Sequence, residues 1–132
     1  MKGKIPQISE AEWQVMKVLW KNPGLSASQV CKEVMKEWGN WSDGTIRTYL
    51  RRLIDKGAIR YEQDKNDSRI YYYFPIINEK DALKQESKSF LDKIIKDKAG
   101  LVLSFLIKDS DLTDEEINEL ENILKEKRSG GK

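Results

Sequence analysis

The spacing of polar and apolar residues predicts three consecutive helices within the first 57 positions. At residues 9–12 and 26–29 a serine is followed three places later by Glu or Gln, which is the capping box of a helix start. Ser42 begins a third helix whose box is incomplete, because Thr45 stands at the third position. Apolar residues at helical spacing follow each start, and a glycine lies just beyond each predicted helix end.

After Gly57 the pattern becomes typical of β-strands. Residues 59–62 and 69–74 are rich in β-branched and aromatic side chains, a polar turn at residues 63–68 separates them, and Pro75 closes the second strand. Three helices followed by a two-stranded hairpin are the element order of a winged helix-turn-helix domain. The alternative is a small α+β domain that binds no nucleic acid. Tyr71, Tyr72 and Tyr73 are expected to alternate between buried and exposed faces.

From Asn78 onward the chain is predicted to be helical. An amphipathic stripe covers residues 83–95, Gly100 interrupts it, residues 101–107 are nearly all apolar, and a capping box at residues 113–116 starts the last helix. These helices are too short and too few to enclose a core. Their apolar faces are therefore expected to pack against a second copy of the chain, or else to fold back on the first domain. The residues assigned to the dimer interface are Leu83, Phe90, Leu91, Ile94, Leu101, Leu103, Phe105, Leu120 and Leu124.

The predicted fold class is mostly α with a small β-hairpin, an α+β arrangement. Residues 1–76 are assigned to a winged-helix DNA-binding domain and residues 77–132 to a helical dimerisation domain.

The net charge of the chain changes sign close to this domain boundary. Residues 1–75 hold 13 Lys and Arg against 9 Asp and Glu, a net charge of +4, whereas residues 76–132 have a net charge of −2. The first half is therefore the better candidate for contact with a polyanion.

Composition excludes several kinds of chemistry. The 132 residues include no histidine and a single cysteine, so a zinc or copper site and a Ser–His or Cys–His nucleophile have no ligands or base. No glycine-rich phosphate loop is present, and the carboxylates occur on polar helix faces. We expect no enzyme, no metal and no cofactor. The lone Cys31 is expected to be a packing residue in a reducing cytoplasm, and no apolar run predicts membrane insertion or a secretory signal.

The third predicted helix has one apolar and one polar side. The polar side combines small hydroxyl residues with arginines. In a major groove threonine can contact a base edge or a thymine methyl group, and arginine can donate two hydrogen bonds to a guanine. The hairpin is expected to contact phosphate or the minor groove. The alternatives are a merely solvated face, or a winged-helix protein-interaction module in which this helix faces a protein. The predicted DNA-binding residues are Ser42, Thr45, Arg47, Thr48, Arg51 and Arg52 in the helix and Lys65 and Arg69 in the hairpin, with Lys2 and Lys4 as further backbone contacts.

Several segments carry a resemblance that covers nearly the whole chain. They are IPQISEAE at residues 5–12, VMKVLW at 15–20, WSxxTIxTxLxRLxxKGA at 41–58, SFL at 89–91, LVLxF at 101–105 and EEIxEL at 115–120. In this order and spacing the chain resembles the penicillinase and methicillin-resistance repressor family.

The resemblance implies a homodimer that binds a palindromic operator in double-stranded DNA and represses β-lactam-resistance or related genes. It places DNA readout in the third helix. It also implies relief of repression by a signalling protease, triggered through a membrane receptor, with a cut between an asparagine and a phenylalanine. The matching pair here is Ser104 and Phe105, so the asparagine is absent. The cysteine cluster of the family's copper-responsive branch is absent as well.

Overall fold

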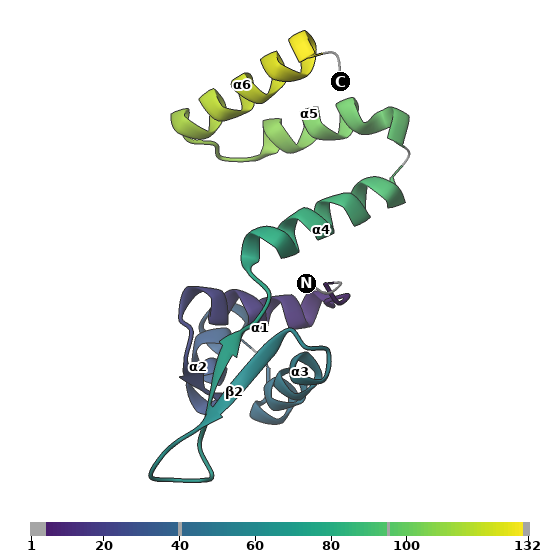
Figure 1. The fold of residues 1–132 in the computed structure, drawn as a ribbon. Coiled ribbons are helices and arrows are strands. Elements are labelled where there is room, and N and C mark those ends of the chain that lie inside the picture. The colour runs from purple at the N-terminus through teal and green to yellow at the C-terminus, as the bar shows by residue number, and fades with distance from the viewer. Residues whose placement is uncertain (1–4, 40, 95, 131–132) are drawn as a thin grey trace. The chain divides into compact units, whose positions relative to one another are not determined.

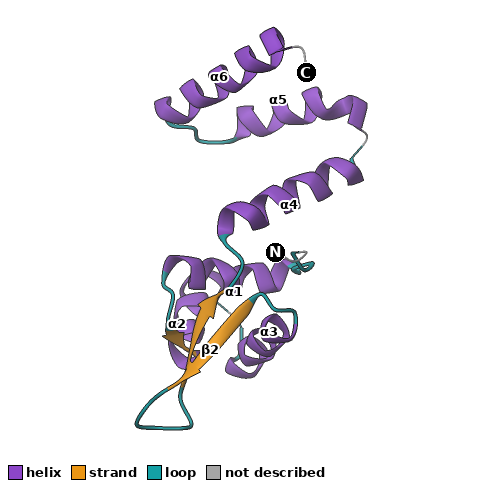
Figure 2. Ribbon diagram, viewed as in Figure 1, coloured by secondary structure: helices purple, strands orange, loops and turns teal. Residues whose placement is uncertain are grey.

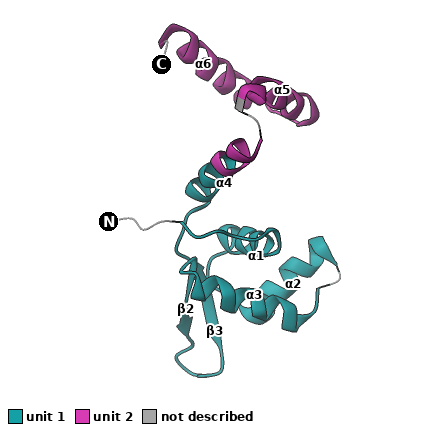
Figure 3. Cartoon of the chain, turned by 90° about the vertical axis from the view of Figure 1, so that its right-hand side faces the viewer, with its two compact units in different colours: residues 1–87 teal, residues 88–132 magenta. Residues whose placement is uncertain are grey.

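The computed structural model describes residues 5–39, 41–94 and 96–130, so Lys2, Lys4 and Ile95 lie outside the described residues. The chain divides into two compact units, residues 1–87 and 88–132 (Figure 3). Helices dominate both, as Figures 1 and 2 show. The elements in chain order are α1 (Glu10–Lys21), β1 (Leu25–Ser26), α2 (Ala27–Trp38), α3 (Asp43–Asp55), β2 (Ile59–Gln63), β3 (Tyr71–Pro75), α4 (Glu79–Lys93), a 3₁₀ helix (Lys96–Lys98), α5 (Ala99–Asp109) and α6 (Asp114–Gly130).

The predicted helix starts are confirmed. Both capping boxes close at α1 and α2, where the serine side chain accepts from a backbone N–H and the Glu or Gln side chain accepts from the serine N–H. At α3 the Ser42 side chain accepts from the backbone N–H of Thr45 at 3.1 Å, without the reciprocal bond. Gly39 and Gly57, which follow α2 and α3, have φ values of 74° and 78°, a conformation that favours glycine. The helix boundaries match because capping is a local interaction.

The predicted hairpin is confirmed as β2 and β3, and the sheet has in addition a third strand that was not predicted, in the order β1-β3-β2. Leu25 pairs with Tyr73 across β1 and β3, and β1 has only two residues, too few to show an alternating pattern. With β3 in the centre, Tyr71, Tyr72 and Tyr73 are all half-buried, so the expected contrast between buried and exposed tyrosines is absent. Gly24 allows the close pairing: its φ is 89°, and a Cβ there would lie 3.1 Å from the Phe74 ring.

The core of the first unit lies among α1, α2, α3 and the sheet. Its buried side chains come from each of these elements, and Cys31 is among them, which confirms the predicted packing role. Trp13, Trp20 and Trp41 are half-buried against this core. The indole N–H of Trp20 donates to the carbonyl of Ile77 at 2.9 Å and fixes the chain just before α4. The buried apolar residues are Ile8, Val15, Met16, Leu19, Ala27, Val30, Cys31, Val34, Ile46, Leu50, Leu53, Ala58 and Ile59.

A buried ion pair joins the start of α1 to the end of α3. The Glu12 side chain is 2 % exposed and accepts hydrogen bonds from the Ser9 backbone N–H and from the Lys56 ammonium group. Lys56 also donates to the Gln7 carbonyl at 2.8 Å. Burial by itself raises the pKa of Glu12, but the hydrogen bonds and charge of Lys56, together with Ser9, outweigh it and hold this pKa below 4.5. Glu12 therefore stays ionised inside the domain.

The helices beyond the first domain leave their apolar residues uncovered. Ala82 is the one buried residue of α4, and the described residues of α5 and α6 include none. The predicted interruption at Gly100 was wrong: Gly100 lies inside α5, whereas α4 ends earlier, at Lys93, and the 3₁₀ helix Lys96–Lys98 precedes α5. None of the described helices is long and apolar enough to cross a bilayer. The exposed large apolar residues are Leu83, Phe90, Leu91, Leu101, Leu103, Phe105, Leu106, Ile107, Ile117, Ile123 and Leu124, while Ile94 and Leu120 are half-buried.

Candidate nucleic-acid interface

Helix α3 presents a ridge of small polar residues to solvent. Ile46, Leu50 and Leu53 are at most 1 % exposed and anchor the opposite side in the core. Thr45 and Thr48 are exposed; the Thr48 hydroxyl donates to the Gly44 carbonyl at 2.9 Å. Thr45 Oγ1 lies 2.9 Å from Ser42 Oγ. We call this surface of Ser42, Thr45 and Thr48 the ridge of α3, with the two threonines as its crest. Its exposed methyl and hydroxyl groups suit insertion into a major groove.

Arg52 lies on one flank of this ridge. Its Cζ is 5.7 Å from the centroid of the Tyr49 ring, at a distance typical of a cation–π contact. The Tyr49 ring packs in turn against Trp41, with ring centroids 5.4 Å apart. The Arg52 guanidinium therefore lies beside the Tyr49 and Trp41 rings.

Arg47 and Arg51 lie on the other flank and line a groove between α3 and the wing, which is the hairpin formed by β2, β3 and the loop between them. The groove has a volume of about 490 Å³, and we call it the α3–wing groove. A smaller hollow of about 190 Å³ shares Arg47 with it and reaches the first residues of α2. The structure thus brings together predicted residues from two separate elements. Three arginines, three tyrosines and one apolar residue line the groove: Arg47, Arg51 and Ile54 from α3, and Tyr61, Arg69, Tyr71 and Tyr73 from the sheet side.

The tyrosines of this groove were not predicted as site residues. Tyr61 is 51 % exposed and meets Tyr71 edge to face, with ring centroids 5.0 Å apart. Burial raises the pKa of the Tyr73 phenol, which is protonated at neutral pH in any case. The sequence did hint at these site residues, since tyrosines occur in both predicted strands of the hairpin. Which of them face α3 depends on the strand register, which the sequence alone did not fix.

The wing loop is folded around two carboxylates. Asp64 Oδ2 accepts from the backbone N–H groups of Asn66 and Asp67, at 2.9 and 3.0 Å. The Tyr72 hydroxyl donates to Asp64 Oδ1 at 2.7 Å and lowers the pKa of Asp64. Asp67 accepts from both Nε and Nη2 of Arg69, each at 3.0 Å, and this pairing lowers the pKa of Asp67. The loop, which projects beyond the strands in Figure 1, is therefore preorganised.

The predicted cations differ in their surroundings. Arg69 is 87 % exposed but bound to Asp67, whereas Lys65 is exposed in the wing loop and does not line the α3–wing groove. Arg47, Arg51 and Arg52 form no ion pair with a carboxylate within the described ranges of the chain. A surface with unneutralised arginines on both flanks of a polar ridge attracts a polyanion.

This fold and surface define a winged helix-turn-helix protein. A family model described as "Penicillinase repressor" matches residues 8–126, and the chain belongs to this family, which is one of repressors and not an enzyme class. The chain is 43 % identical over 127 residues to the penicillinase repressor of Bacillus licheniformis, covering 96 % of this chain and 95 % of that one. It is 39 % identical over 128 residues to the methicillin resistance regulatory protein MecI of Staphylococcus aureus (strain N315), covering 96 % and 100 %.

Solved structures agree on the fold. The solution structure of the DNA-binding domain of the repressor BlaI matches with a TM-score of 0.51 and 45 % identity, over 59 % of this chain and 90 % of that one. A point mutant of MepR from S. aureus matches with a TM-score of 0.51 over 95 % of this chain and 80 % of that one. At 18 % identity this second likeness concerns the fold alone. The predicted fold class and the family resemblance are confirmed.

Proposed function

We propose that this protein is a homodimeric transcriptional repressor that binds a palindromic operator in double-stranded DNA and controls β-lactam-resistance or related genes. The observation that carries the proposal is the polar ridge of α3 with arginines on both flanks, none of them paired with a carboxylate in the described part of the chain. The relatives are named as repressors of penicillinase and regulators of methicillin resistance, which supports the same role. We assign DNA binding to residues 1–76 and dimerisation to residues 77–132.

In the proposed complex α3 enters the major groove with its N-terminal end toward the bases. Ser42, Thr45 and Thr48 then face base edges, and their hydroxyls exchange local hydrogen bonds for bonds to DNA. Arg47, Arg51 and Arg52 reach guanines or phosphates on either side of the ridge. Lys65 and Arg69 contact phosphate or the minor groove from the wing.

The proposed dimer is held by the exposed apolar residues of the C-terminal helices. Leaving side chains such as Leu101, Leu103 and Leu124, all more than half exposed, in water is unfavourable by roughly 25 cal/mol per Å² of apolar surface. A second copy of the chain is the occupant we propose, because a two-fold dimer presents two DNA-binding domains to the two halves of a palindrome.

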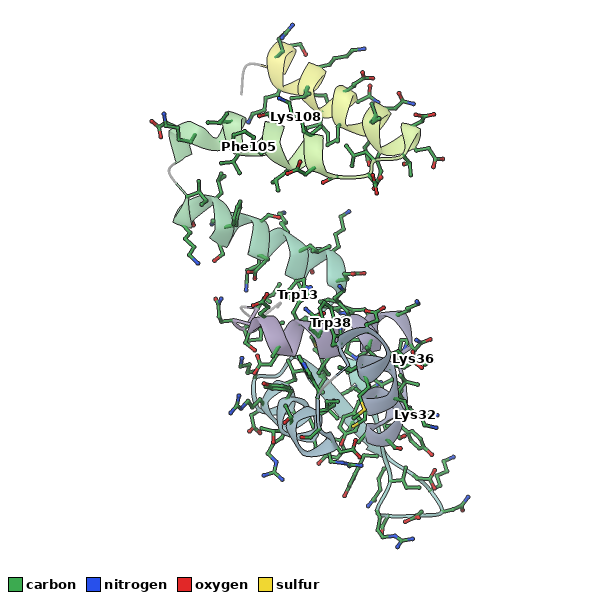
Figure 4. All side chains as sticks on the ribbon, turned by 180° about the vertical axis from the view of Figure 1, so that it is seen from behind. Trp13, Lys32, Lys36, Trp38, Phe105 and Lys108 are labelled. Atoms are coloured by element: carbon green, nitrogen blue, oxygen red, sulfur yellow. The ribbon has the colours of Figure 1, made fainter. Side chains whose placement is uncertain are left out.

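Relief of repression by a signalling protease is part of the proposal. Ser104 and Phe105 lie in the middle of α5, and Figure 4 labels Phe105 on this helix. A helical peptide bond must unwind locally before a protease can cut it. The N-terminal end of α5 at Lys98 has no side-chain cap, which favours such opening. A cut between Ser104 and Phe105 detaches α6 and part of the apolar surface, and the dimer weakens.

Replacing Arg51 by alanine tests the proposed readout. The variant is expected to bind its operator about 1–3 kcal/mol more weakly, because one guanidinium contact to a base is lost. The measurement is a fluorescence anisotropy titration on a duplex that the full chain has selected from a random pool. Arg60→Ala is the matched control: it removes the same charge from the same domain, but Arg60 packs on Phe74 and pairs with Glu62.

Equal affinities of the two variants for the duplex would show that Arg51 does not contribute to DNA readout.

A salt titration of the unaltered chain tests the function as a whole. Affinity for the duplex should fall steeply with salt, because phosphate contacts release counterions. A chain that binds no selected duplex at low salt would instead support the protein-interaction module.

A further inference from the structure

We propose that the α3–wing groove is also a binding site for a small aromatic anion, an aromatic ring system that carries a phosphate group. The groove is concave and measures about 490 Å³, within the range of small-molecule sites. It differs in shape and in residues from the convex ridge of α3, and its lining combines cationic and aromatic side chains.

The cationic side chains of the groove are suited to a phosphate. Arg47, Arg51 and Arg69 line it together, and no carboxylate is among its lining residues. Asp67 neutralises Arg69, but Arg47 and Arg51 have no carboxylate partner in the described ranges of the chain. Two planar guanidinium groups four residues apart on one helix can hold a phosphate through paired N–H donors.

The aromatic side chains of the groove are suited to a ring. Tyr61, Tyr71 and Tyr73 form the sheet-side wall, and Ile54 adds an apolar surface from α3. A planar heterocycle gains from stacking on such rings whatever its hydrogen-bonding pattern. Since the Tyr73 phenol stays protonated at neutral pH, it can donate to an anionic oxygen and does not repel it.

The groove uses a different side of α3 from the ridge. Arg47, Arg51 and Ile54 recur at intervals of four and three residues and share the flank toward the sheet. Thr45 and Thr48 form the crest, and Arg52 turns toward Tyr49. A ligand in the groove therefore occupies Arg47 and Arg51 without covering the crest. If these arginines also contact the operator, which rests on the proposed function, ligand and DNA compete.

Calorimetric titration of the full chain with adenosine 5′-monophosphate tests the site. We expect saturable binding of one molecule per chain. Ribose 5-phosphate has the same phosphate without the ring, and adenosine has the ring without the phosphate; each is expected to bind at least about tenfold more weakly. Binding of ribose 5-phosphate as tight as that of the nucleotide, or no binding of the nucleotide, would overturn the proposal.

Two variants and a control locate the site. Tyr61→Ala removes a half-exposed ring at little risk to the fold, and Arg51→Ala removes a guanidinium; each should weaken nucleotide binding about tenfold. Arg52→Ala removes the same charge from the far flank of α3 and should leave nucleotide binding unchanged. Circular dichroism checks that each variant is folded. Equal losses in Arg51→Ala and Arg52→Ala would indicate attraction by net charge alone and refute the site.

Competition with DNA separates this site from the proposed function. With a selected operator duplex bound, added nucleotide should displace the chain at concentrations that fill the groove. If the nucleotide binds but no duplex is ever bound, the groove site stands and the repressor function fails. If nucleotide and duplex bind together without mutual effect, the shared use of Arg47 and Arg51 is refuted.

Discussion

Replacing Lys56 by methionine is expected to lower the free energy of unfolding at neutral pH by about 2–4 kcal/mol, as for a buried ion pair that loses one partner. The loss arises because Glu12, 2 % exposed, would keep a buried negative charge, with the Ser9 N–H as the one backbone donor to its carboxylate among the described residues. The hydrogen bond from Lys56 to the Gln7 carbonyl is lost too. The loss is expected to be smaller than for a fully buried pair, since the Lys56 side chain is 32 % exposed and partly screened by water.

Urea denaturation of Lys56→Met beside Lys36→Met measures this effect. Lys36 lies on α2, as labelled in Figure 4, and pairs with Glu33 at 3.1 Å on the surface, with 69 % of its side chain exposed. Loss of this surface pair should change the free energy of unfolding by less than about 1 kcal/mol. Similar losses in the two variants would mean that burial of Glu12 adds nothing to the Lys56 pair.

The pH dependence of the Lys56 effect has a definite sign. In the unaltered chain the pKa of Glu12 is lowered from 4.5, so the stabilisation from its ionised form is present above that value and is lost as pH falls through the lowered pKa. In Lys56→Met only the hydrogen bonds with Ser9 still oppose the effect of burial, so the pKa of Glu12 rises relative to its value in the unaltered chain. The deficit of the variant should therefore shrink between about pH 7 and about pH 4. In the Glu12→Gln background the effect of Lys56→Met should not depend on pH in this way.

Features that are written into neighbouring residues could be predicted from the sequence. The helix starts follow from capping boxes, whose bonds join residues three apart, and the core side of α3 follows from its 3.6-residue period. The apolar stripe beyond residue 83 was likewise visible, and most of its members are exposed.

Features that depend on residues far apart could not be predicted. Glu12 was expected to cap α1, but its pairing with Lys56 joins positions 44 apart, which no local pattern reveals. The strand β1 exists only because β3 is there to pair with it. The α3–wing groove depends on which side of α3 the sheet covers, so the meeting of Arg47 with Arg69 and Tyr71 required the tertiary structure.

Replacing Leu120 and Leu124 together by aspartate is expected to produce a monomer whose affinity for a full palindromic operator is about 10²- to 10⁴-fold lower. Both leucines lie on α6, one half-buried and one 65 % exposed, on the surface we assign to the second copy. Two charges there oppose burial between chains. Without the link between two DNA-binding domains, the gain in effective concentration at the second half-site is lost. Sedimentation velocity measures the assembly state, and anisotropy titrations measure affinity.

Asn118→Asp with Asn122→Asp is the matched control, because it places the same two charges four residues apart on another side of α6. It should stay dimeric and bind the full operator as the unaltered chain does. Both double variants should bind an isolated half-site with unaltered affinity, since the first unit, residues 1–87, is unchanged. If Leu120→Asp with Leu124→Asp remains a dimer, the interface lies on α4 or α5. If it is a monomer but loses half-site affinity as well, the C-terminal helices act on the DNA-binding domain directly, and linkage of two half-sites does not explain their role.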